Sequence, residues 1–519
     1  TARAYRPLWI INAIAATVNA EALAQLDAMA EVDRIVADRT HEAFGPPVSQ
    51  PDISAGSVEF AGWASAPQSA NGQTQGWSLL RIRAPQVWNL LGTEGDGATV
   101  AIVDTGVDWQ HPALQANYRG GQGASANHEG NWYSPVQPTQ TTPIDLHGHG
   151  THVAGIAVGS QGIGVAPGAK WIAVAIADEN GRIRDSDVHA AFQWLLAPAG
   201  KPDLAPDIVN NSWGTAGDYT VFREDVRALQ LAGIIPVFAA GNGGPGLGTI
   251  QAPASYTGTI GVAAEDESGF VTWFSSRGPS PIAEDLKPFL SAPGVRIRSA
   301  LPGGRYAYLN GTSMATPHVA GTIALMLSAE PRLNPEDVSR RLANSAGAIH
   351  SQMAGWGSLD AFAAVAPLRA TGYIMGRVAN EGPLPGATVS ITSTNGIAAE
   401  FMTDVDGGFS VPVIGGQYRL QVEAPGYLPS QVYNVDMTHA PVIYLQMSLA
   451  PLPTGRLTVA VHGSDGSALP YGALAFSANG TTLTVAPTHQ EAGRYTVELP
   501  VGQYQIRAGL PGYRAQSHL

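Results

Sequence analysis

Between residues 98 and 240, short runs of almost wholly apolar residues alternate with segments that have helical periodicity. The runs carry apolar side chains at consecutive positions rather than at every second one, which is typical of strands covered on both faces. Strands that alternate with helices predict an α/β domain with a doubly wound, mostly parallel sheet. The strand-like runs are Ala98–Asp104, Ala169–Ile176, Asp207–Ser212 and Ile234–Ala240, and the helical segments include Ser186–Leu196 and Phe222–Ala232.

The composition limits what else the 519-residue chain contains. Hydrophobic residues make up 44%, enough for buried cores, and the length predicts roughly three or four domains. The net charge is −13 with no run of Lys or Arg, so neither nucleic acid nor an anionic membrane is an expected partner. There is no cysteine, which excludes a disulfide scaffold, a thiol nucleophile and a Cys-ligated metal. No stretch reaches the roughly 20 apolar residues that a membrane-spanning helix needs.

Three separate motifs each contain one member of a set suited to nucleophilic catalysis. They are Val-Asp-Thr-Gly-Val-Asp, His-Gly-Thr-His-Val-Ala-Gly and Gly-Thr-Ser-Met-Ala-Thr-Pro-His, which contribute Asp104, His149 and Ser313. A serine hydroxyl is a weak nucleophile near neutral pH, so it needs a base within hydrogen-bond reach and a third group that orients the base. Because the motifs lie far apart in the chain, only a folded domain can bring these three residues together.

The order of the motifs, first Asp, then His, then Ser, is that of subtilisin, whereas α/β-hydrolases have the order Ser, acid, His. With three extended motifs in this order, the chain resembles the subtilisin-like serine peptidases, or subtilases. The segments Asn-Asn-Ser-Trp-Gly, Trp-Phe-Ser-Ser-Arg-Gly-Pro-Ser and Trp-Ile-Ile-Asn-Ala-Ile-Ala-Ala-Thr resemble the bacillopeptidase F-like branch. The resemblance covers about residues 1–366 and predicts a peptidase domain at 76–367.

More than one residue could serve as the acid or as the base of this set. Asp104 ends an apolar strand, where open α/β sheets place their sites, whereas Asp108 falls in the turn beyond it. Of three nearby histidines, the family motif aligns on His149. The resemblance then makes His152 a packing residue on the same helix and His147 a loop residue. The expected base is therefore His149.

The nucleophile and the oxyanion donor are predicted at the ends of two regular elements. Ser313 opens a helix whose N-terminus favours developing negative charge, and an ordinary N-capping serine is the alternative. Attack on an amide creates an oxyanion that must be stabilised. The string Ala-Ala-Gly-Asn-Gly resembles the subtilase segment with the oxyanion asparagine, which assigns Asn242 together with the backbone N–H of Ser313. An Asn between glycines is otherwise a common turn residue.

The resemblance also implies two edges for an extended peptide. One is Ser212-Trp213-Gly214 with Gly241, and the other is Arg182-Ile183-Arg184. Backbone pairing along such edges accepts many peptide sequences, while side-chain pockets add preference. Trp213 is expected to line the pocket for the fourth residue before the scissile bond, and a core aromatic is the alternative.

Residues 1–45 are similar to part of a subtilase propeptide. An apolar stretch, a helical segment from Asn19 to Ala30 and a strand at Arg34–Arg39 are expected. A secretory signal peptide and a domain of another kind are the alternatives, but Asn12 interrupts the apolar stretch. Residues 46–75 are aperiodic and turn-rich, which predicts a linker that contains the processing site. Since the first residue is not Met, a processed or partial sequence is expected.

After Ala370 the composition changes to short strand-like runs and turns. Asp-Gly-Gly-Phe-Ser-Val and Gly-Gln-Tyr-Arg-Leu recur further on as Ala-Gly-Arg-Tyr-Thr-Val and Gly-Gln-Tyr-Gln-Ile. This repeat predicts two small all-β sandwich modules, at 370–452 and 453–519, which resemble carboxypeptidase regulatory-like domains. The second module ends before any counterpart of Val442–Leu449 and is expected to be truncated.

Together these features imply a secreted serine endopeptidase that acts on proteins or peptides through an acyl-enzyme. Its own propeptide is the expected inhibitor and chaperone, and a cell-surface or polymer ligand is the expected partner of the β modules. The alternative is an inactive subtilase scaffold that binds a surface partner. Such proteins usually lose a member of the triad, whereas here all are present.

No cofactor is expected for catalysis. Many subtilisins have an Asp that ligates calcium within His-Pro-Asp-Leu, but here the string is His111-Pro-Ala113-Leu. Because calcium prefers carboxylate-rich cages, that site is expected to be absent, and calcium at other positions stays open.

Overall fold

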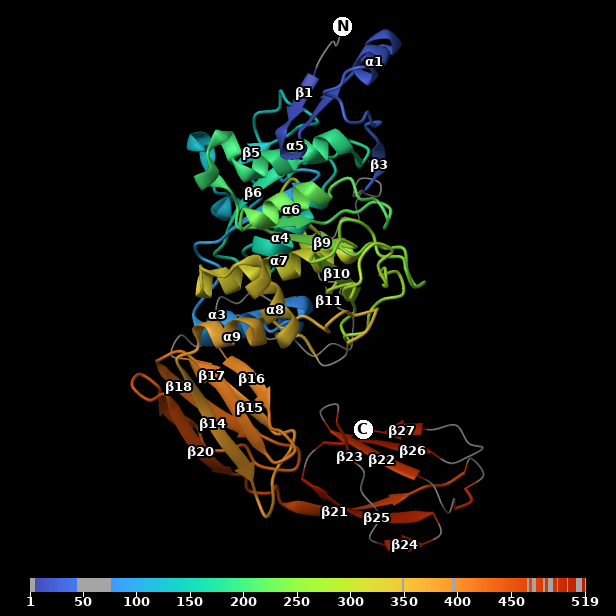
Figure 1. Cartoon of the computed structure of the whole chain (residues 1–519). Coiled ribbons are helices and arrows are strands. Elements are labelled where there is room, and N and C mark those ends of the chain that lie inside the picture. Colours follow the sequence, from blue (N-terminus) through green and yellow to red (C-terminus); the bar gives the residue numbers. More distant parts are fainter. Residues whose placement is uncertain are drawn as a thin grey trace. The chain divides into compact units, whose positions relative to one another are not determined.

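The computed structural model describes most of the chain, and its two compact units, Thr1–Ala370 and Thr371–Leu519, are considered separately (Figure 1). The expected processing linker at 46–75 lies outside the described residues. The described residues are 5–43, 76–347, 350–393, 398–463, 466–468, 473–478, 481–483, 489–491, 493–501, 503–509 and 516–518.

A seven-stranded sheet forms the centre of the first unit, in the order β11-β10-β9-β8-β4-β6-β5. Every neighbouring pair is parallel, and nearly every residue of the longer strands is buried, which explains their consecutive apolar residues. The predicted doubly wound sheet is therefore confirmed. The strands are β4 (Thr99–Asp104), β5 (Trp132–Tyr133), β6 (Lys170–Ala175), β8 (Ile208–Asn211), β9 (Ile235–Ala239), β10 (Ile260–Glu265) and β11 (Leu290–Pro293).

Helices cover both faces of this sheet (Figure 1). α5 and α6 pack on one face, where Phe192, Phe222 and Phe238 belong to one buried cluster. α4 and α7 pack on the other face, with α9 against α7 and the β12–β13 hairpin against α4. The helices are α2 (Trp77–Arg81), α3 (Ala84–Leu91), α4 (His149–Val158), α5 (Asp185–Leu196), α6 (Arg223–Leu231), α7 (Thr312–Ala329), α8 (Pro335–Ser345) and α9 (Ala361–Arg369), and the hairpin strands are β12 (Ile297–Leu301) and β13 (Arg305–Leu309).

The strand order reverses beside β4. From β4, the chain first builds β5 and β6 on one side and then adds β8 to β11 on the other. Open α/β sheets bind ligands at the carboxyl ends of the strands where the order reverses. The fold therefore directs attention to the ends of β4 and β8, where Asp104 and Ser212 lie.

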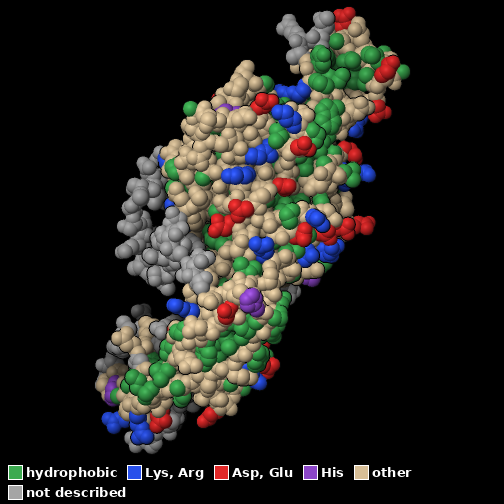
Figure 2. Space-filling view, turned by 90° about the vertical axis from the view of Figure 1, so that its left-hand side faces the viewer, with side chains coloured by type: hydrophobic (Ala, Val, Ile, Leu, Met, Phe, Trp, Pro, Cys, Tyr) green, Lys and Arg blue, Asp and Glu red, His purple; other side chains and the backbone are tan. Residues whose placement is uncertain are grey.

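The N-terminal segment belongs to the same unit. β1 (Tyr5–Leu8) and β2 (Ala13–Ala16) form an antiparallel hairpin, and α1 (Ala20–Asp27) follows. Figure 2 shows hydrophobic side chains gathered on the surface of this segment.

The strand predicted at Arg34–Arg39 was wrong. The strand that forms is β3 (Thr40–Glu42), which pairs antiparallel with β7 (Arg182–Arg184) of the same unit. The residues before β3 are instead held by the first residues of α5. The Arg39 N–H donates to the Asp185 carboxylate at 3.2 Å, and the Asp38 carboxylate accepts from Ser186 N–H at 2.9 Å.

The second unit consists of two all-β modules, as predicted. The first has sheets β17-β14-β20 and β16-β15-β18-β19, with the alternating burial typical of a sandwich. The second repeats the pattern with β21-β25-β24 and β23-β22-β26-β27. The strands are β14 (Gly372–Ala379), β15 (Thr388–Ser393), β16 (Ala398–Met402), β17 (Gly408–Val413), β18 (Gln417–Glu423), β19 (Tyr433–Asp436), β20 (Val442–Ser448), β21 (Thr454–Ala460), β22 (Ala473–Ala478), β23 (Thr481–Leu483), β24 (His489–Glu491), β25 (Arg494–Pro500), β26 (Gln505–Gly509) and β27 (Gln516–His518).

Acidic and basic side chains are interspersed on the face of the first unit seen in Figure 2. None of the helices within the described ranges combines the length and the apolar character needed to cross a membrane.

Candidate active site

Asp104 and His149 are joined by a hydrogen bond of 2.8 Å between Oδ1 and Nδ1. Asp104 is the last residue of β4 and is fully buried, and His149 is the first residue of α4 with its side chain 13% exposed. The two elements approach closely, since a Cβ atom on Gly150 would lie 2.1 Å from the carbonyl oxygen of Gly106. The glycine after His149 is therefore required for the contact between β4 and α4.

The surroundings of His149 raise its pKa. Burial alone lowers the pKa, but the charge of Asp104 and the hydrogen bond to it, with a smaller contribution from the charge of Asp145, shift it above the ordinary value. A carboxylate only accepts hydrogen bonds, so Nδ1 carries the proton in this pair. Nε2 is then the ring nitrogen that can accept a proton from a nucleophile.

The other two histidines of this stretch have different surroundings. His152 is fully buried in α4, with Nε2 3.1 Å from the carbonyl oxygen of Ala307. Burial lowers the pKa of His152 to about 3, so its ring stays neutral. His147 lies in the loop before α4, with its ring 6.3 Å from that of His149. The structure thus places His152 in the packing and His147 in a loop, as expected.

Ser313 is the second residue of α7, where a helix was predicted. Its hydroxyl donates to the carbonyl oxygen of Ser212 at 3.0 Å, and the Ser212 hydroxyl donates to the carbonyl oxygen of Ser313 at 2.9 Å. This reciprocal pair joins the start of α7 to the residue that follows β8. Ser212, predicted on a peptide-binding edge, therefore lies directly beside Ser313.

Asn242 is exposed in the turn after β9, and its amide oxygen is held by Thr312. The oxygen accepts from the Thr312 N–H at 3.0 Å and from the Thr312 hydroxyl at 3.1 Å. Its side-chain N–H₂ group lies near the backbone N–H of Ser313. An added Cβ on Gly311 would lie 3.5 Å from the Asn242 Nδ2 and 3.6 Å from the Ser313 nitrogen. The side-chain nitrogen of Asn242 and the backbone nitrogen of Ser313 therefore lie on the same side of the start of α7.

Thr312 was not singled out from the sequence. Its hydroxyl also accepts from the Gly241 N–H at 3.1 Å, so one side chain connects the start of α7 to the Asn242 turn. The only sequence signal for this role is a hydroxyl residue at the start of a helix, which is a common feature.

The residues predicted to bind a peptide differ in their surroundings. β7 pairs with β3, so the Arg182–Arg184 edge carries an antiparallel strand of the same chain. Gly214 and Gly241 both lie against Gln251, whose Oε1 would be 2.8 Å and 2.5 Å from a Cβ atom at those positions. Trp213 is 2% exposed, in the buried cluster that includes Phe238. This burial favours the core alternative for Trp213 over the pocket-lining role.

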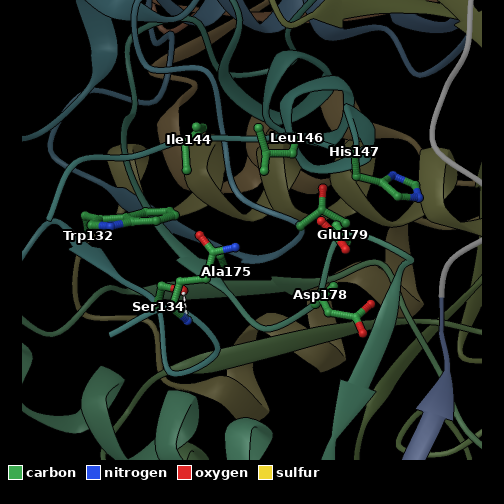
Figure 3. Close-up of a pocket in the computed structure, with 11 residues that line it drawn as sticks. Trp132, Ser134, Ile144, Leu146, His147, Ala175, Asp178 and Glu179 are labelled. Atoms are coloured by element: carbon green, nitrogen blue, oxygen red, sulfur yellow. Dashed lines mark hydrogen bonds between the residues drawn. The ribbon is translucent and has the colours of Figure 1, made fainter. Parts of the chain in front are cut away.

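A small cavity of about 20 Å³ lies beside Thr105 and the loop before α4 (Figure 3). His147 and Glu179 lie on one side of it and Trp132 on the other. The volume suffices for about one water molecule. In the described part of the chain, no group of three or more His, Asp or Glu side chains is arranged to hold a metal ion.

A parallel α/β sheet with an acid, an imidazole and a serine hydroxyl at its carboxyl edge is the architecture of a serine hydrolase. Comparison with known proteins narrows this class. The model of the subtilase family matches residues 95–357, and that of the carboxypeptidase regulatory-like domain matches residues 373–450. The chain belongs to the subtilase family of serine peptidases.

Individual relatives agree with this assignment. Bacillopeptidase F of Bacillus subtilis (strain 168) is 36% identical over 404 residues, which are 72% of this chain and 27% of that protein. Subtilisin E of the same organism is 36% identical over 281 residues, 53% of this chain and 66% of that protein. Subtilisin BL of Lederbergia lenta is 34% identical over 297 residues, 56% of this chain and 99% of that protein. The chain thus spans only about a quarter of bacillopeptidase F.

Proposed function

We propose that this protein is a serine endopeptidase with Ser313 as nucleophile, His149 as base and Asp104 as the group that orients the base. The observation that carries the proposal is the 2.8 Å hydrogen bond between Asp104 and His149, in the same domain as α7, whose second residue is Ser313. Asn242 completes the set as the side-chain donor to the oxyanion.

In the proposed reaction, the Ser313 Oγ attacks the carbonyl carbon of the scissile amide while its proton moves to Nε2 of His149. The carbonyl oxygen becomes an oxyanion near the N–H donors of Asn242 and Ser313. The C–N bond breaks as the imidazolium returns the proton to the leaving amine. Water then hydrolyses the acyl-enzyme by the same proton relay, which restores the Ser313 hydroxyl.

Hydrolysis of casein, with and without a serine-directed fluorophosphonate, tests this function. Wild-type protein is expected to cleave casein and to lose this activity when labelled. Ser313→Ala is expected to fold normally, because the loss of a single hydroxyl oxygen barely changes the packing. The variant should be inactive and should not be labelled. Labelling of Ser313→Ala would show that the nucleophile is another residue. Absence of both activity and labelling in the wild type would favour the alternative of a non-catalytic binding scaffold.

We further propose that residues 1–45, of which the structure describes 5–43, act as an inhibitory propeptide. β3 occupies the β7 edge that a substrate strand would need, and the His41 ring is 2.8 Å from the Asp185 carboxylate at the end of that edge. Cleavage is expected between His41 and Gln75. N-terminal sequencing of the mature protein checks this, and Ser313→Ala should remain uncleaved if the protein processes itself. A mature N-terminus beyond Arg81 would contradict the proposal.

Secretion and a tethering role of the β modules complete the proposed function. Both rest on the propeptide-like segment and on the modules that follow the peptidase domain. A pull-down of the 371–519 unit with insoluble cell-wall polysaccharide tests the tethering role. Equal retention of this unit and an unrelated β-sandwich would contradict that role.

A further inference from the structure

A carboxylate outside the catalytic set lies at the centre of the contacts around His149. Asp145 is four residues before His149, in the loop between β5 and α4, and is 6% exposed. Gly148 at the N-cap of α4 has no side chain, so the N–H groups at the start of this helix need an acceptor from elsewhere.

Asp145 supplies that acceptor with both oxygens. Oδ1 accepts from the backbone N–H groups of His147 at 3.1 Å and Gly148 at 2.7 Å. Oδ2 accepts from the Thr151 N–H at 2.9 Å and from the Thr151 hydroxyl at 2.7 Å. The backbone on both sides of His149 is therefore held by a single side chain.

The same carboxylate is connected to the segment that contains Asp104. The Thr105 hydroxyl donates to Oδ1 of Asp145 at 2.9 Å and accepts from the Gly150 N–H at 2.9 Å. The Thr105 N–H in turn donates to Oδ1 of Asp104 at 2.8 Å, the same oxygen that contacts His149. A short chain of hydrogen bonds thus runs from Asp145 through Thr105 to the acid of the proposed triad.

The hydrogen bonds around Asp145 fit its ionised form. All five of its partners are N–H or O–H groups. Both hydroxyls accept from a backbone N–H, that of Gly150 on Thr105 and that of Asp108 on Thr151, so their own hydrogens point toward Asp145. Burial raises the pKa of Asp145 above its ordinary value although the hydrogen bonds act to lower it, and the five donors around its two oxygens stabilise the carboxylate.

From this geometry, and given the proposed peptidase function, we infer that Asp145 is a positioning residue. It fixes the start of α4 relative to the end of β4, so that His149 is held both on Asp104 and in reach of a nucleophile. It touches neither substrate nor reacting atoms and acts only through the backbone of the His149 turn and through Thr105.

Asp145→Asn tests this role with little change in volume. One carboxylate oxygen becomes an N–H₂ group that faces N–H and O–H donors, so the backbone around His149 should shift. Turnover should fall roughly 10²-fold, which is the loss expected when a reacting group is displaced by about 1 Å. The charge of Asp145 also raises the pKa of His149. The acidic limb of kcat/KM should therefore move to lower pH in the variant, because His149 then loses its proton at lower pH.

The rate of fluorophosphonate labelling, followed against pH, gives a second readout that needs no substrate. Asp108→Asn is the matched control, because it removes another carboxylate from the same region. The Asp108 Oδ2 accepts from the backbone N–H of Gly303 at 2.8 Å and not from α4. It should label like the wild type. Thr105→Val should slow labelling as Asp145→Asn does, and Thr105→Ser, which keeps the hydroxyl, should restore the rate.

These outcomes separate the inference from the function on which it rests. If the wild type does not label, the proposed function fails. If the wild type labels and a folded Asp145→Asn labels at the same rate with an unmoved acidic limb, the positioning role is overturned. If Asp145→Asn does not fold, the Thr105 pair decides: equal rates for Thr105→Val and Thr105→Ser overturn the role.

Discussion

At the scale of single residues, Asn242 is the most direct test of how the proposed oxyanion is stabilised. Asn242→Ala should lower kcat about 10²–10³-fold, the magnitude known for loss of such a donor in subtilisin, with KM nearly unchanged. The side chain is exposed and contacts Thr312 by its oxygen, so the folded state should lose little stability. Steady-state kinetics and thermal unfolding check both points. Wild-type turnover would place the donor elsewhere, and an unfolded variant would make Asn242 structural.

The raised pKa of His149 leads to a prediction for the pH dependence of catalysis. The proposed base must be neutral, and the charge of Asp104 favours its protonated form. The kcat/KM should therefore fall as the pH is lowered through a midpoint above the ordinary histidine value of about 6.5. A profile of kcat/KM from pH 5 to 9 checks this. A midpoint below that of free histidine would mean that burial outweighs Asp104.

Sequence motifs predicted Asp104, His149, Ser313 and Asn242 because these positions match the motifs that contain the catalytic residues of a known family. They did not predict Asp145. Its partners are mainly backbone N–H groups, which every residue has, and only the fold brings Thr105 within reach of it. Trp213 was expected to line a pocket, but it is buried in the core. The sequence could not show this, since a tryptophan after a strand can face either a cleft or the core.

At the scale of elements, the contact between β4 and α4 has a specific steric requirement. Gly150→Ala would place a Cβ atom 2.1 Å from the carbonyl oxygen of Gly106. The helix must then move, which should cost about 1–3 kcal/mol of unfolding free energy and most of the activity. Chemical denaturation and casein hydrolysis measure the two effects.

Gly246→Ala is the matched control for Gly150→Ala. Its added Cβ atom would contact only Thr249 Cγ2, at 3.5 Å, which is an ordinary van der Waals distance. Its stability should therefore be close to that of the wild type. If Gly150→Ala is as stable and active as this control, the helix has more room to move than the structure shows.

The elements themselves could be predicted wherever local pattern and fold agree. The runs of β4, β6, β8 and β9 are apolar throughout because both faces of the sheet are covered, and this is visible in the sequence. β3 could not be predicted in this way. Arg34–Arg39 has the more strand-like composition, but pairing depends on which residues reach β7, a contact between segments more than a hundred residues apart.

At the scale of the whole molecule, the peptidase unit should be separable from the β modules. All the proposed catalytic residues precede Ala370, where the first compact unit ends, and a domain of this size has its own core. A protein truncated after Ala370, which keeps α9 complete, should be soluble and hydrolyse casein at a rate close to that of the full chain. Circular dichroism and the casein assay check this. Loss of folding would show that the modules contribute to the peptidase core.

The pairing of β3 with β7 has a kinetic consequence. In the proposed propeptide this strand is covalently joined to the domain with which it pairs, so its effective concentration at the β7 edge should be of about millimolar order, and dilute external peptide should compete poorly. Activity in a fresh preparation should therefore begin slowly and accelerate, because each molecule that has shed its strand can cut the tether of others. Such a sigmoidal time course has a lag that shortens as the protein is concentrated. A lag that is independent of concentration would instead mean that each molecule releases only itself.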